Sequence, residues 1–597
     1  MSRTEITAYL VFWQETGVPL QWRDPCVNDP GGAMILGIDV GGTHTDAVLL
    51  SKQGLVATAK VITDHDDLLG SICRALEDIL RVDPMSELKR FNLSTTLCTN
   101  AIVQDELEEV GVLVSAGPGI DPGRFSIGTS YTLISGGLDH RGAEITPLDM
   151  DQVNKTVQTC LDQQIKVFSL VGKFSPRNPA HEEQMAAGLE GRCDFMTLGH
   201  RLSGQLNFPR RIATAFYNSA VWPVFNRFAN SVTRSLEELG IVPPHLNILK
   251  ADGGTMTMSQ ARQIPVESIF SGPSASIMGC VAMCRPEQDA ILLDMGGTTT
   301  DMAVFASGDP LIETESMDLV HRPTLVRAMK TKSIGLGGDS ALSCSGGQLQ
   351  IGPKRFGPCM ACGGGLPTVV DALNLVQDLG FGDLEASEKG ILEIAGHFQE
   401  TAKDCARRIV ETLCRELKNQ ALEMLSRINE RPVYTVHELL EYRTIQPRKV
   451  YLIGGPGRML APFLGEALGL PVVVPDHYQV ANALGAALAR PTMEVELFAD
   501  TQKRVVTIPV LGVNEAIASD YTLDTARREV VDRLCGFLGS RLDWKVSPAD
   551  VEIVEASAMN MVNDVYQVGQ DIRVKSQIKP GIVPDYDRAV RCVCKEL

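Results

Sequence analysis

Asp39-Val-Gly-Gly-Thr-His-Thr-Asp46 is the stretch of this sequence that decides the fold, because it recurs as Asp294-Met-Gly-Gly-Thr-Thr-Thr-Asp301. Six of the eight positions are identical in the two copies. In each copy a short apolar run leads into the first aspartate and another follows the last one. Both copies therefore predict a strand, a glycine turn and a returning strand. An internal duplication is the economical explanation.

The two loops carry the groups that a nucleotide triphosphate needs. Backbone N–H groups approach phosphate oxygens, hydroxyls replace water, and carboxylates hold the Mg²⁺ ion that offsets the charge. We expect the loop glycines to take positive φ and allow close approach, and the threonines to supply hydroxyls. These residues are Gly41, Gly42, Thr43, Thr45, Gly296, Gly297, Thr298, Thr299 and Thr300. Asp39 and Asp294 are expected to face a shared Mg²⁺ through water, and Asp301 is the candidate proton acceptor.

A single Gly-Gly-Thr turn flanked by acids is also typical of an ordinary hairpin with solvated caps. Two copies with the same flanking acids favour the phosphate-binding interpretation. The pattern differs from Gly-x-x-x-x-Gly-Lys-Ser/Thr and from Gly-x-Gly-x-x-Gly, so it indicates neither a P-loop NTPase nor a Rossmann dehydrogenase.

Composition narrows the class of protein. The 597 residues suffice for several domains, and the formal charge of -18 disfavours binding to a nucleic-acid backbone. The 15 cysteines are scattered and follow no secretory signal pattern, which favours a reducing cytoplasm. No apolar run approaches the ~20 residues needed to cross a bilayer, so no membrane segment is predicted.

The order of predicted elements indicates an α/β protein. We expect a flexible leader or a start codon assigned too early at residues 1–33, a first nucleotide lobe with inserted segments at 34–285, and a second lobe at 286–490. An appended α/β module of undeclared role follows at 491–597. A strand over 449–453 leads into the turn Gly454-Gly-Pro-Gly457 and a helix to about Leu468.

Taken with the turn at Gly454, the duplicated loops resemble the acetate and sugar kinase, chaperone ATPase and actin superfamily. That resemblance implies two ribonuclease-H-like domains that clasp ATP. Within the superfamily the sequence is similar to the hydantoinase/oxoprolinase family, in particular to its A-type subunit, from about Ile35 to Ala489. The segments that carry this similarity are Ser94-Thr-Thr-Leu-Cys-Thr-Asn100, Arg141-Gly-Ala-Glu-Ile-Thr-Pro147, Asn178-Pro-Ala-His181, Ser271-Gly-Pro-Ser-Ala275, Ser333-Ile-Gly-Leu-Gly-Gly338 and Pro367-Thr-Val-Val-Asp371.

The resemblance implies an enzyme that uses ATP and Mg²⁺ to phosphorylate the oxygen of a cyclic amide or related carbonyl compound. A separate B-type partner would then complete ring opening or carboxylation. The resemblance places Gly337 and Gly338 beside the nucleotide. Gly454 and Gly455 would let the adenosine lie against the backbone, with Asn482 near that end. The chain has Asn92-Leu-Ser-Thr-Thr96 where the family commonly has a His-Gly-Thr-Thr segment, so the substrate is expected to differ from hydantoin or oxoproline.

Several side chains outside the loops stay open to two interpretations. Thr95, Thr96 and Asn100 fit a substrate site that binds a carbonyl or carboxylate, and they fit a plain helix cap almost as well. Arg210 and Arg211 fit either an anion grip or a surface pair.

The phosphate loops alone also allow other classes of function. One is an actin-fold ATPase that activates a partner metalloenzyme, for which Cys359 and Cys362 have the spacing of a metal clip without a second pair. Another is a stand-alone small-molecule kinase.

Overall fold

The computed structural model describes residues 21–23, 33–64, 66–83, 88–313, 317–430, 443–539, 546–563, 566–586, 589–590 and 595–596. The predicted leader therefore lies mostly outside the described residues. Within it, β1 (Gln21–Arg23) pairs with an edge of the first sheet. The predicted domain boundaries at 34, 286 and 491 stay predictions.

The first loop lies at the centre of a mixed sheet. Its strands are β2 (Met34–Val40), β3 (His44–Ser51), β4 (Gly54–Ile62), β5 (Leu88–Thr95) and β12 (His245–Leu249), flanked by β1 and β13 (Thr255–Thr257). The order is β1-β4-β3-β2-β5-β12-β13. β3 and β4 run antiparallel to their neighbours, whereas β2, β5 and β12 run parallel. Every residue of β2 is buried, as expected for a strand covered on both faces.

The second loop lies in a sheet of the same order. β14 (Ala290–Met295) pairs antiparallel with β15 (Thr300–Ala306) and parallel with β22 (Lys449–Ile453), which pairs parallel with β23 (Val472–Val474). β19 (Thr331–Ile334) adds to β15 as β4 adds to β3. The short strands β16 (Asp309–Pro310) and β29 (Lys595–Glu596) complete the edges. The strand order thus confirms the predicted duplication of a ribonuclease-H-like unit.

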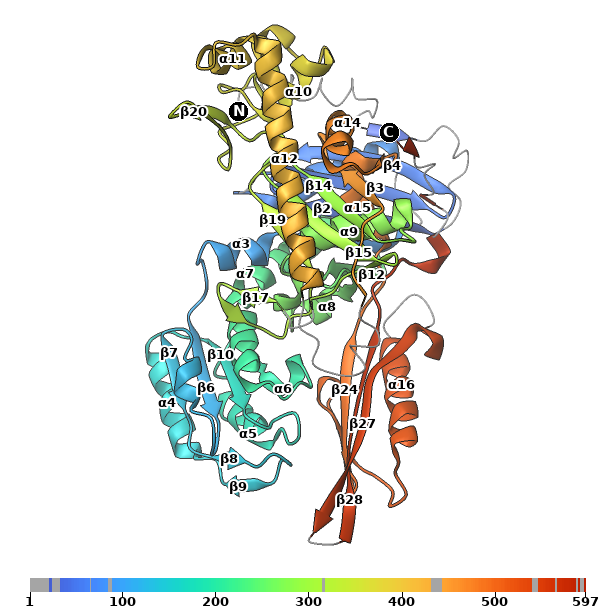
Figure 1. Ribbon diagram of the computed structural model, residues 1–597. Helices are drawn as coiled ribbons and strands as arrows, with labels where there is room; N and C mark the ends of the chain where they lie inside the picture. The colour runs from blue at the N-terminus through green and yellow to red at the C-terminus, as the bar shows by residue number, and fades with distance from the viewer. Residues whose placement is uncertain are drawn as a thin grey trace.

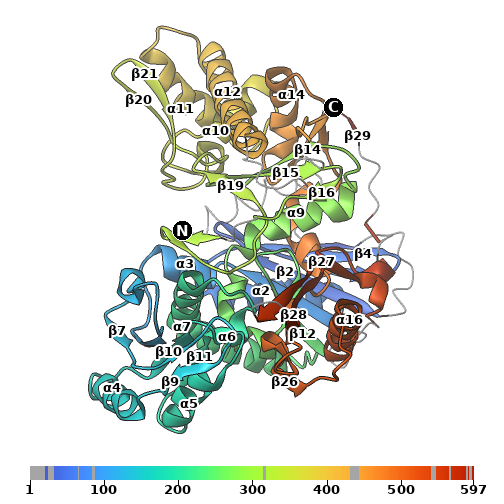
Figure 2. The same cartoon turned by 60° about the horizontal axis from the view of Figure 1, so that its bottom comes forward.

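Two helices of small residues lie between the sheets, α9 (Ser271–Cys284) and α15 (Ala481–Leu488) (Figure 2). A Cβ on Gly485 would stand 2.0 Å from the carbonyl oxygen of Ala275, and one on Gly279 would stand 2.1 Å from that of Ala481. Because real Cβ atoms do not approach so closely, glycine is required for this crossing. The crossing joins the two lobes at the base of the phosphate loops.

A helical layer covers the second lobe. It contains α10 (Val369–Gln377), α11 (Leu384–Gly396), α12 (Ala402–Asn429) and α14 (Gly457–Leu468). α11 and α12 are separate helices, because Thr401 begins α12 by accepting a hydrogen bond from Asp404 N. In Figure 1, α12 runs along the length of this lobe.

An inserted unit interrupts the first lobe. Its parallel sheet has the order β11-β10-β6-β7, built from β6 (Val110–Ser115), β7 (Ser130–Leu133), β10 (Val167–Gly172) and β11 (Phe195–Leu198). The remaining elements are η1 (Pro122–Phe125), β8 (Gly137–Leu138), β9 (Glu144–Thr146), α4 (Met150–Asp162), α5 (Ala180–Leu189) and α6 (Gly199–Leu202). α7 (Phe208–Glu238) connects the unit back to the lobe, next to α2 (Leu68–Val82), α3 (Leu97–Val103) and α8 (Met258–Ala261).

The C-terminal module is an antiparallel sheet in the order β26-β25-β24-β28-β27, packed against one helix. It contains β24 (Glu494–Asp500), β25 (Val505–Ile508), β26 (Val513–Ala516), α16 (Leu523–Gly539), β27 (Val551–Asn563) and β28 (Tyr566–Ile578). Figure 1 shows it beside the inserted unit. Arg177 pairs with Asp571 at 2.5 Å and Arg141 with Asp500 at 2.7 Å, which ties the module to that unit. Among the described helices, none is both long and apolar enough to cross a membrane.

Candidate functional site

The two phosphate loops face each other across the junction of the lobes. Asp39 lies opposite Asp46 in the β2–β3 ladder, and Asp294 lies opposite Asp301 in the β14–β15 ladder. The hydroxyl of Thr43 stands 3.4 Å from the position that a Cβ on Gly297 would take. The residues predicted from the two copies are therefore brought together at one place.

The loop glycines have a different role from the one predicted. Gly41, Gly42, Gly296 and Gly297 all have negative φ, so the expectation that they take left-handed backbone is wrong. A Cβ on Gly42 would meet nothing within 4 Å, which means that the loop opens onto free space. Gly41 N donates to His44 O at 3.0 Å and Gly296 N donates to Thr299 O at 2.9 Å, so these two glycines close the turns. Gly42 leaves open the space that a phosphate would need.

A second glycine segment packs on the second loop. Gly338 N donates to Gly296 O at 2.9 Å, and Asp339 N donates to Gly297 O at 2.7 Å. A Cβ on Gly337 would lie 2.5 Å from Gly297 O. Gly337 and Gly338 thus form the wall next to the second phosphate loop.

The turn at Gly454 also packs against the second loop. Gly454 has φ of +89°, and a Cβ there would lie 2.3 Å from Met295 O and 2.7 Å from Asp294 Oδ1. Gly455 follows in the turn that leads into α14, and Pro456 lies 2.6 Å from the Cβ position of Gly338. Gly337, Gly338 and Gly454 therefore border the second loop.

Asp294 is held by two side chains that the sequence analysis did not place there. Ser276 Oγ on α9 donates to Asp294 Oδ2 at 2.5 Å, and Asn482 Nδ2 on α15 donates to the same oxygen at 3.3 Å. Asn482 was expected near the adenosine end, and the structure instead places it at this acid. Burial raises the pKa of Asp294, and these two hydrogen bonds partly offset that effect.

Asp39 is buried, with Ser94 and Asn482 as side-chain hydrogen-bond partners and one carboxylate oxygen left over. It is 4% exposed, and among the described residues no group donates a hydrogen bond to its Oδ1. Burial, reinforced by the negative charges of Asp46 and Asp294, raises its pKa to about 7. A cation here would satisfy the buried oxygen and favour the ionised acid, so the donor set fits Mg²⁺.

The second acid of each loop has its own environment. Asp46 Oδ1 accepts from Lys60 Nζ at 2.6 Å, and Lys60 also donates to Gln479 O at 3.2 Å. Asp46 is therefore engaged in an ion pair, and Lys60 is a site residue that the sequence analysis missed. In the described part of the chain no cation pairs with Asp301, and burial together with the charge of Asp294 raises the pKa of this acid to about 7. This makes Asp301 the better proton acceptor near neutral pH.

The predicted substrate residues lie at the end of β5, beside the first loop. Thr95 pairs with Val40 across the ladder, is 1% exposed, and accepts a hydrogen bond from Leu97 N through its hydroxyl. Thr96 begins α3 without a side-chain cap, and Asn100 Nδ2 donates to its hydroxyl at 3.5 Å. Thr95 therefore acts as a local cap in this conformation. The substrate role of all three residues stays a prediction.

Two other candidates have structural explanations. Arg211 is fully buried and donates to the carbonyl oxygens of Gly172, Lys173 and Gln205 inside the inserted unit, so the structure places it away from both loops. Cys359 and Cys362 are buried in a small apolar cluster with Val370 and Phe381. A hydrogen bond from Cys362 and burial raise the pKa of Cys359, which disfavours the thiolate that a metal needs.

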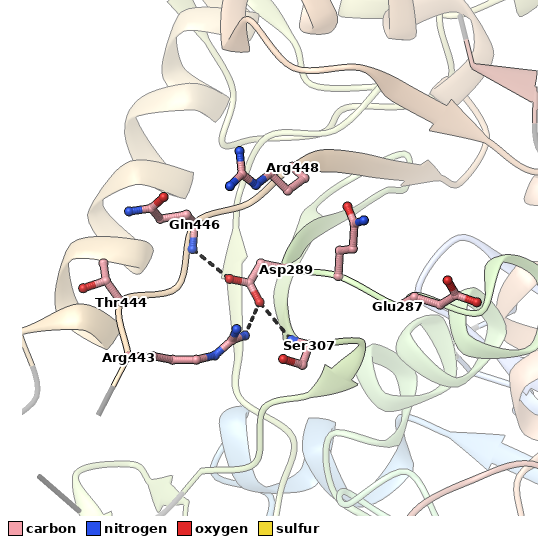
Figure 3. Close-up of a pocket in the computed structure, with 8 residues that line it drawn as sticks. Glu287, Asp289, Ser307, Arg443, Thr444, Gln446 and Arg448 are labelled. Atoms are coloured by element: carbon pink, nitrogen blue, oxygen red, sulfur yellow. Dashed lines mark hydrogen bonds and ion pairs between the residues drawn. The ribbon is translucent and has the colours of Figure 1, made fainter. Parts of the chain in front are cut away.

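An open pocket at the far end of β14 lies away from the loops. Its volume is about 580 Å³, and its centre is Asp289, which accepts from Ser307 N at 2.8 Å and Gln446 N at 3.0 Å (Figure 3). Arg443 also pairs with this carboxylate. Asp289 precedes β14, whereas Asp294 lies near its other end, so this carboxylate anchors the strand and does not join the site.

Family models match most of the chain. The hydantoinase/oxoprolinase model matches residues 211–495, and the model of the hydantoinase/oxoprolinase N-terminal region matches residues 35–192. The alpha subunit of caprolactamase from Pseudomonas jessenii is 28% identical over 478 residues, covering 74% of this chain and 68% of that protein. 5-Oxoprolinase 1 of Arabidopsis thaliana is 23% identical over 482 residues, covering 74% of this chain and 36% of that protein.

Solved structures share the fold. The ATP-dependent caprolactamase of Pseudomonas jessenii matches with a TM-score of 0.66 at 19% identity, covering 91% of this chain and 87% of that one. Nucleotide-free acetone carboxylase matches with a TM-score of 0.65 at 15% identity, covering 95% and 93% of the two chains. These likenesses confirm the architecture of two lobes with added units.

Proposed function

The chain belongs to the hydantoinase/oxoprolinase family, and we propose that it is an ATP-dependent subunit that phosphorylates the oxygen of a cyclic amide or related carbonyl compound. The observation that carries this proposal is the pairing of Asp294 with Asp301 on a loop that faces its own duplicate. Asp294 accepts a hydrogen bond from Ser276, and the pKa of Asp301 is raised to about 7. Phosphoryl transfer needs little beyond such positioning and charge stabilisation.

In the proposed step, the amide oxygen attacks the γ-phosphorus of ATP. The bond from that phosphorus to the β–γ bridging oxygen breaks, and ADP leaves with the electron pair. The amide N–H proton passes to Asp301, so the product is an O-phosphorylated imidate. We assign the first lobe's glycines and threonines to the phosphates, and Asp39 and Asp294 to the Mg²⁺ ion. When bound, Mg²⁺ would offset the phosphate charge.

Phosphorylation converts a poor electrophile into an activated one. Two named relatives support a ring-opening reaction, the caprolactamase alpha subunit and 5-oxoprolinase 1. A relative described as an alpha subunit also supports a separate B-type partner that completes ring opening or carboxylation. The match covers 36% of 5-oxoprolinase 1.

ADP release tests the proposal. The purified chain should release ADP faster with one member of a panel of lactams, hydantoins, 5-oxoproline and ketones, with a further increase when the B-type partner is added. Asp294→Ala should abolish the stimulated release and keep the secondary structure measured by circular dichroism. ADP release that ignores every small molecule and responds only to a protein partner would instead indicate a conformational ATPase.

A further inference from the structure

A cation lies where the two phosphate loops meet. Arg355 Nε donates to Asp339 Oδ2 at 3.0 Å, and the same Asp339 oxygen stands 2.7 Å from the position of a Cβ on Gly297. Thr43 of the first loop stands 3.4 Å from that position. Arg355 is thus attached to a residue that lies next to the contact between the loops.

The backbone fixes this placement. Ala341 N donates to Lys354 O at 3.1 Å, and Gly352 N donates to Ala341 O at 2.9 Å, so the segment before Arg355 is paired with the segment after Asp339. A Cβ on Gly335 would meet Pro353 at 2.8 Å. These contacts hold the guanidinium close to the second loop at little cost in side-chain entropy.

Electrostatics place the same guanidinium near the first loop. Burial lowers the pKa of His44 well below its usual value, and the positive charges of Lys60 and Arg355 lower it further. His44 is the residue between Thr43 and Thr45, so Arg355 acts on both loops. Asp339 is 6% exposed, whereas the Arg355 side chain keeps 28% of its exposure and can reach a ligand.

We propose that Arg355 is a catalytic residue that binds the transferring phosphoryl group and stabilises the charge that develops on it, with Asp339 as its positioning residue. This inference rests on the proposed function. A guanidinium has five N–H donors. The hydrogen bond from Nε to Asp339 fixes the orientation of the group, and we assign its terminal N–H groups to the phosphoryl oxygens. Phosphoryl transfer gains most from such a cation in the transition state, where an arginine typically contributes about 10³–10⁵ in rate.

This function differs from that of the loop acids. Asp39 and Asp294 are assigned to Mg²⁺, and Lys60 is committed to Asp46. Arg355 comes from the insertion after β21 (Gln348–Ile351) in the second lobe, so it reaches the γ-phosphate position only while the lobes are together. It therefore supplies a reason for ATP cleavage to depend on closure of the two lobes.

The test compares binding of ADP with binding of ADP, Mg²⁺ and aluminium fluoride, a mimic of the transferring group, by isothermal titration of the full chain. For Arg355→Gln we expect ADP affinity within about twofold of wild type and a loss of about 100-fold or more in affinity for the aluminium fluoride complex. Lys354→Gln removes the same charge from the neighbouring exposed residue and should change neither affinity. Asp339→Asn should give a smaller loss in the same direction.

A second variant keeps the inference falsifiable. In Arg355→Ala, added guanidinium at low millimolar concentration should restore part of the intrinsic ATP turnover, an effect that a purely structural arginine would not give. Equal binding of the aluminium fluoride complex by Arg355→Gln and wild type would overturn the inference and leave the proposed function standing. Failure of the wild-type chain to bind ADP at all would instead remove the proposed function itself.

Discussion

Ser276 Oγ donates to Asp294 Oδ2 at 2.5 Å, and this contact links the helix between the lobes to the acid of the second phosphate loop. Asn482 Nδ2 on α15 donates to the same oxygen at 3.3 Å, and Asn482 Oδ1 lies 3.1 Å from Ser276 Oγ, so α9 and α15 both contact this carboxylate. These helices also form the glycine crossing of the lobes. The proposed metal-binding acid and the crossing therefore share Ser276 and Asn482.

Removal of the Ser276 hydroxyl should weaken Mg²⁺-ATP binding. A hydrogen bond to a charged group contributes about 1.5–3 kcal/mol, which corresponds to a loss of about tenfold to 100-fold in affinity for Ser276→Ala. Isothermal titration with Mg²⁺ and a non-hydrolysable ATP analogue measures this affinity in the variant and in wild type. Ser274→Ala serves as the matched control, because Ser274 lies on the same helix and donates to Ala251 O at 2.6 Å. An equal loss in both variants would show that the effect comes from α9 in general.

Breaking the pair between Lys60 and Asp46 should destabilise the first lobe. Lys60→Met leaves Asp46 buried without its cation, and such losses cost about 3–5 kcal/mol. The double variant Lys60→Met/Asp46→Asn removes both charges and should recover at least half of the loss. Urea unfolding of the two variants and of wild type measures the free energy of unfolding. No recovery in the double variant would mean that the packing of the Lys60 side chain, rather than its charge, stabilises the lobe.

Because of Asp301, enzyme activity should rise with pH while the stability of the fold falls with pH. Its pKa is raised from 3.8 to about 7, so the folded protein favours the protonated acid. The contribution of this group to stability is therefore greatest below pH 3.8 and is lost as the pH rises to about 7. As a base it must be ionised, so kcat/KM for ATP cleavage should rise with pH through a midpoint near 7. Asp301→Asn should remove that limb of the profile, and a profile unchanged in this variant would assign the base elsewhere.

The sequence alone predicted the parts of the site that are local in the chain. The duplicated loop specified two strand pairs and the position of four acids, because strand–turn–strand geometry depends on adjacent residues. The glycines at 337, 338 and 454 followed from the family resemblance, and the structure places each of them against the second loop.

What could not be predicted depends on contacts between distant segments. Ser276 and Asn482 meet Asp294 across 18 and 188 positions, and nothing in their local sequence indicates that meeting. Arg211 looked like half of a surface pair, although it is fully buried among carbonyl oxygens. Arg211 lies in the first turn of α7, which begins at Phe208 because Asn207 accepts a hydrogen bond from Arg210 N.

Alanine substitutions at Gly42 and Gly454 should distinguish a glycine needed for ligand binding from a glycine needed for stability of the fold. A Cβ on Gly42 meets no protein atom within 4 Å, so Gly42→Ala should keep its melting temperature within about 2 °C and still lose at least about tenfold in ADP affinity. Gly454 has φ of +89° and its Cβ would stand 2.3 Å from Met295 O, so Gly454→Ala should lose both stability and affinity.

Gly191→Ala isolates the cost of the backbone conformation in this comparison, because Gly191 has φ of +70° and nothing within 4 Å. It should lose about 1 kcal/mol of stability and no ADP affinity. The extra loss in Gly454→Ala then measures the clash with Met295 and Asp294. Unchanged ADP affinity in Gly42→Ala would place the phosphates away from the first loop, since a methyl group in an empty phosphate site can only be harmless if the ligand lies elsewhere.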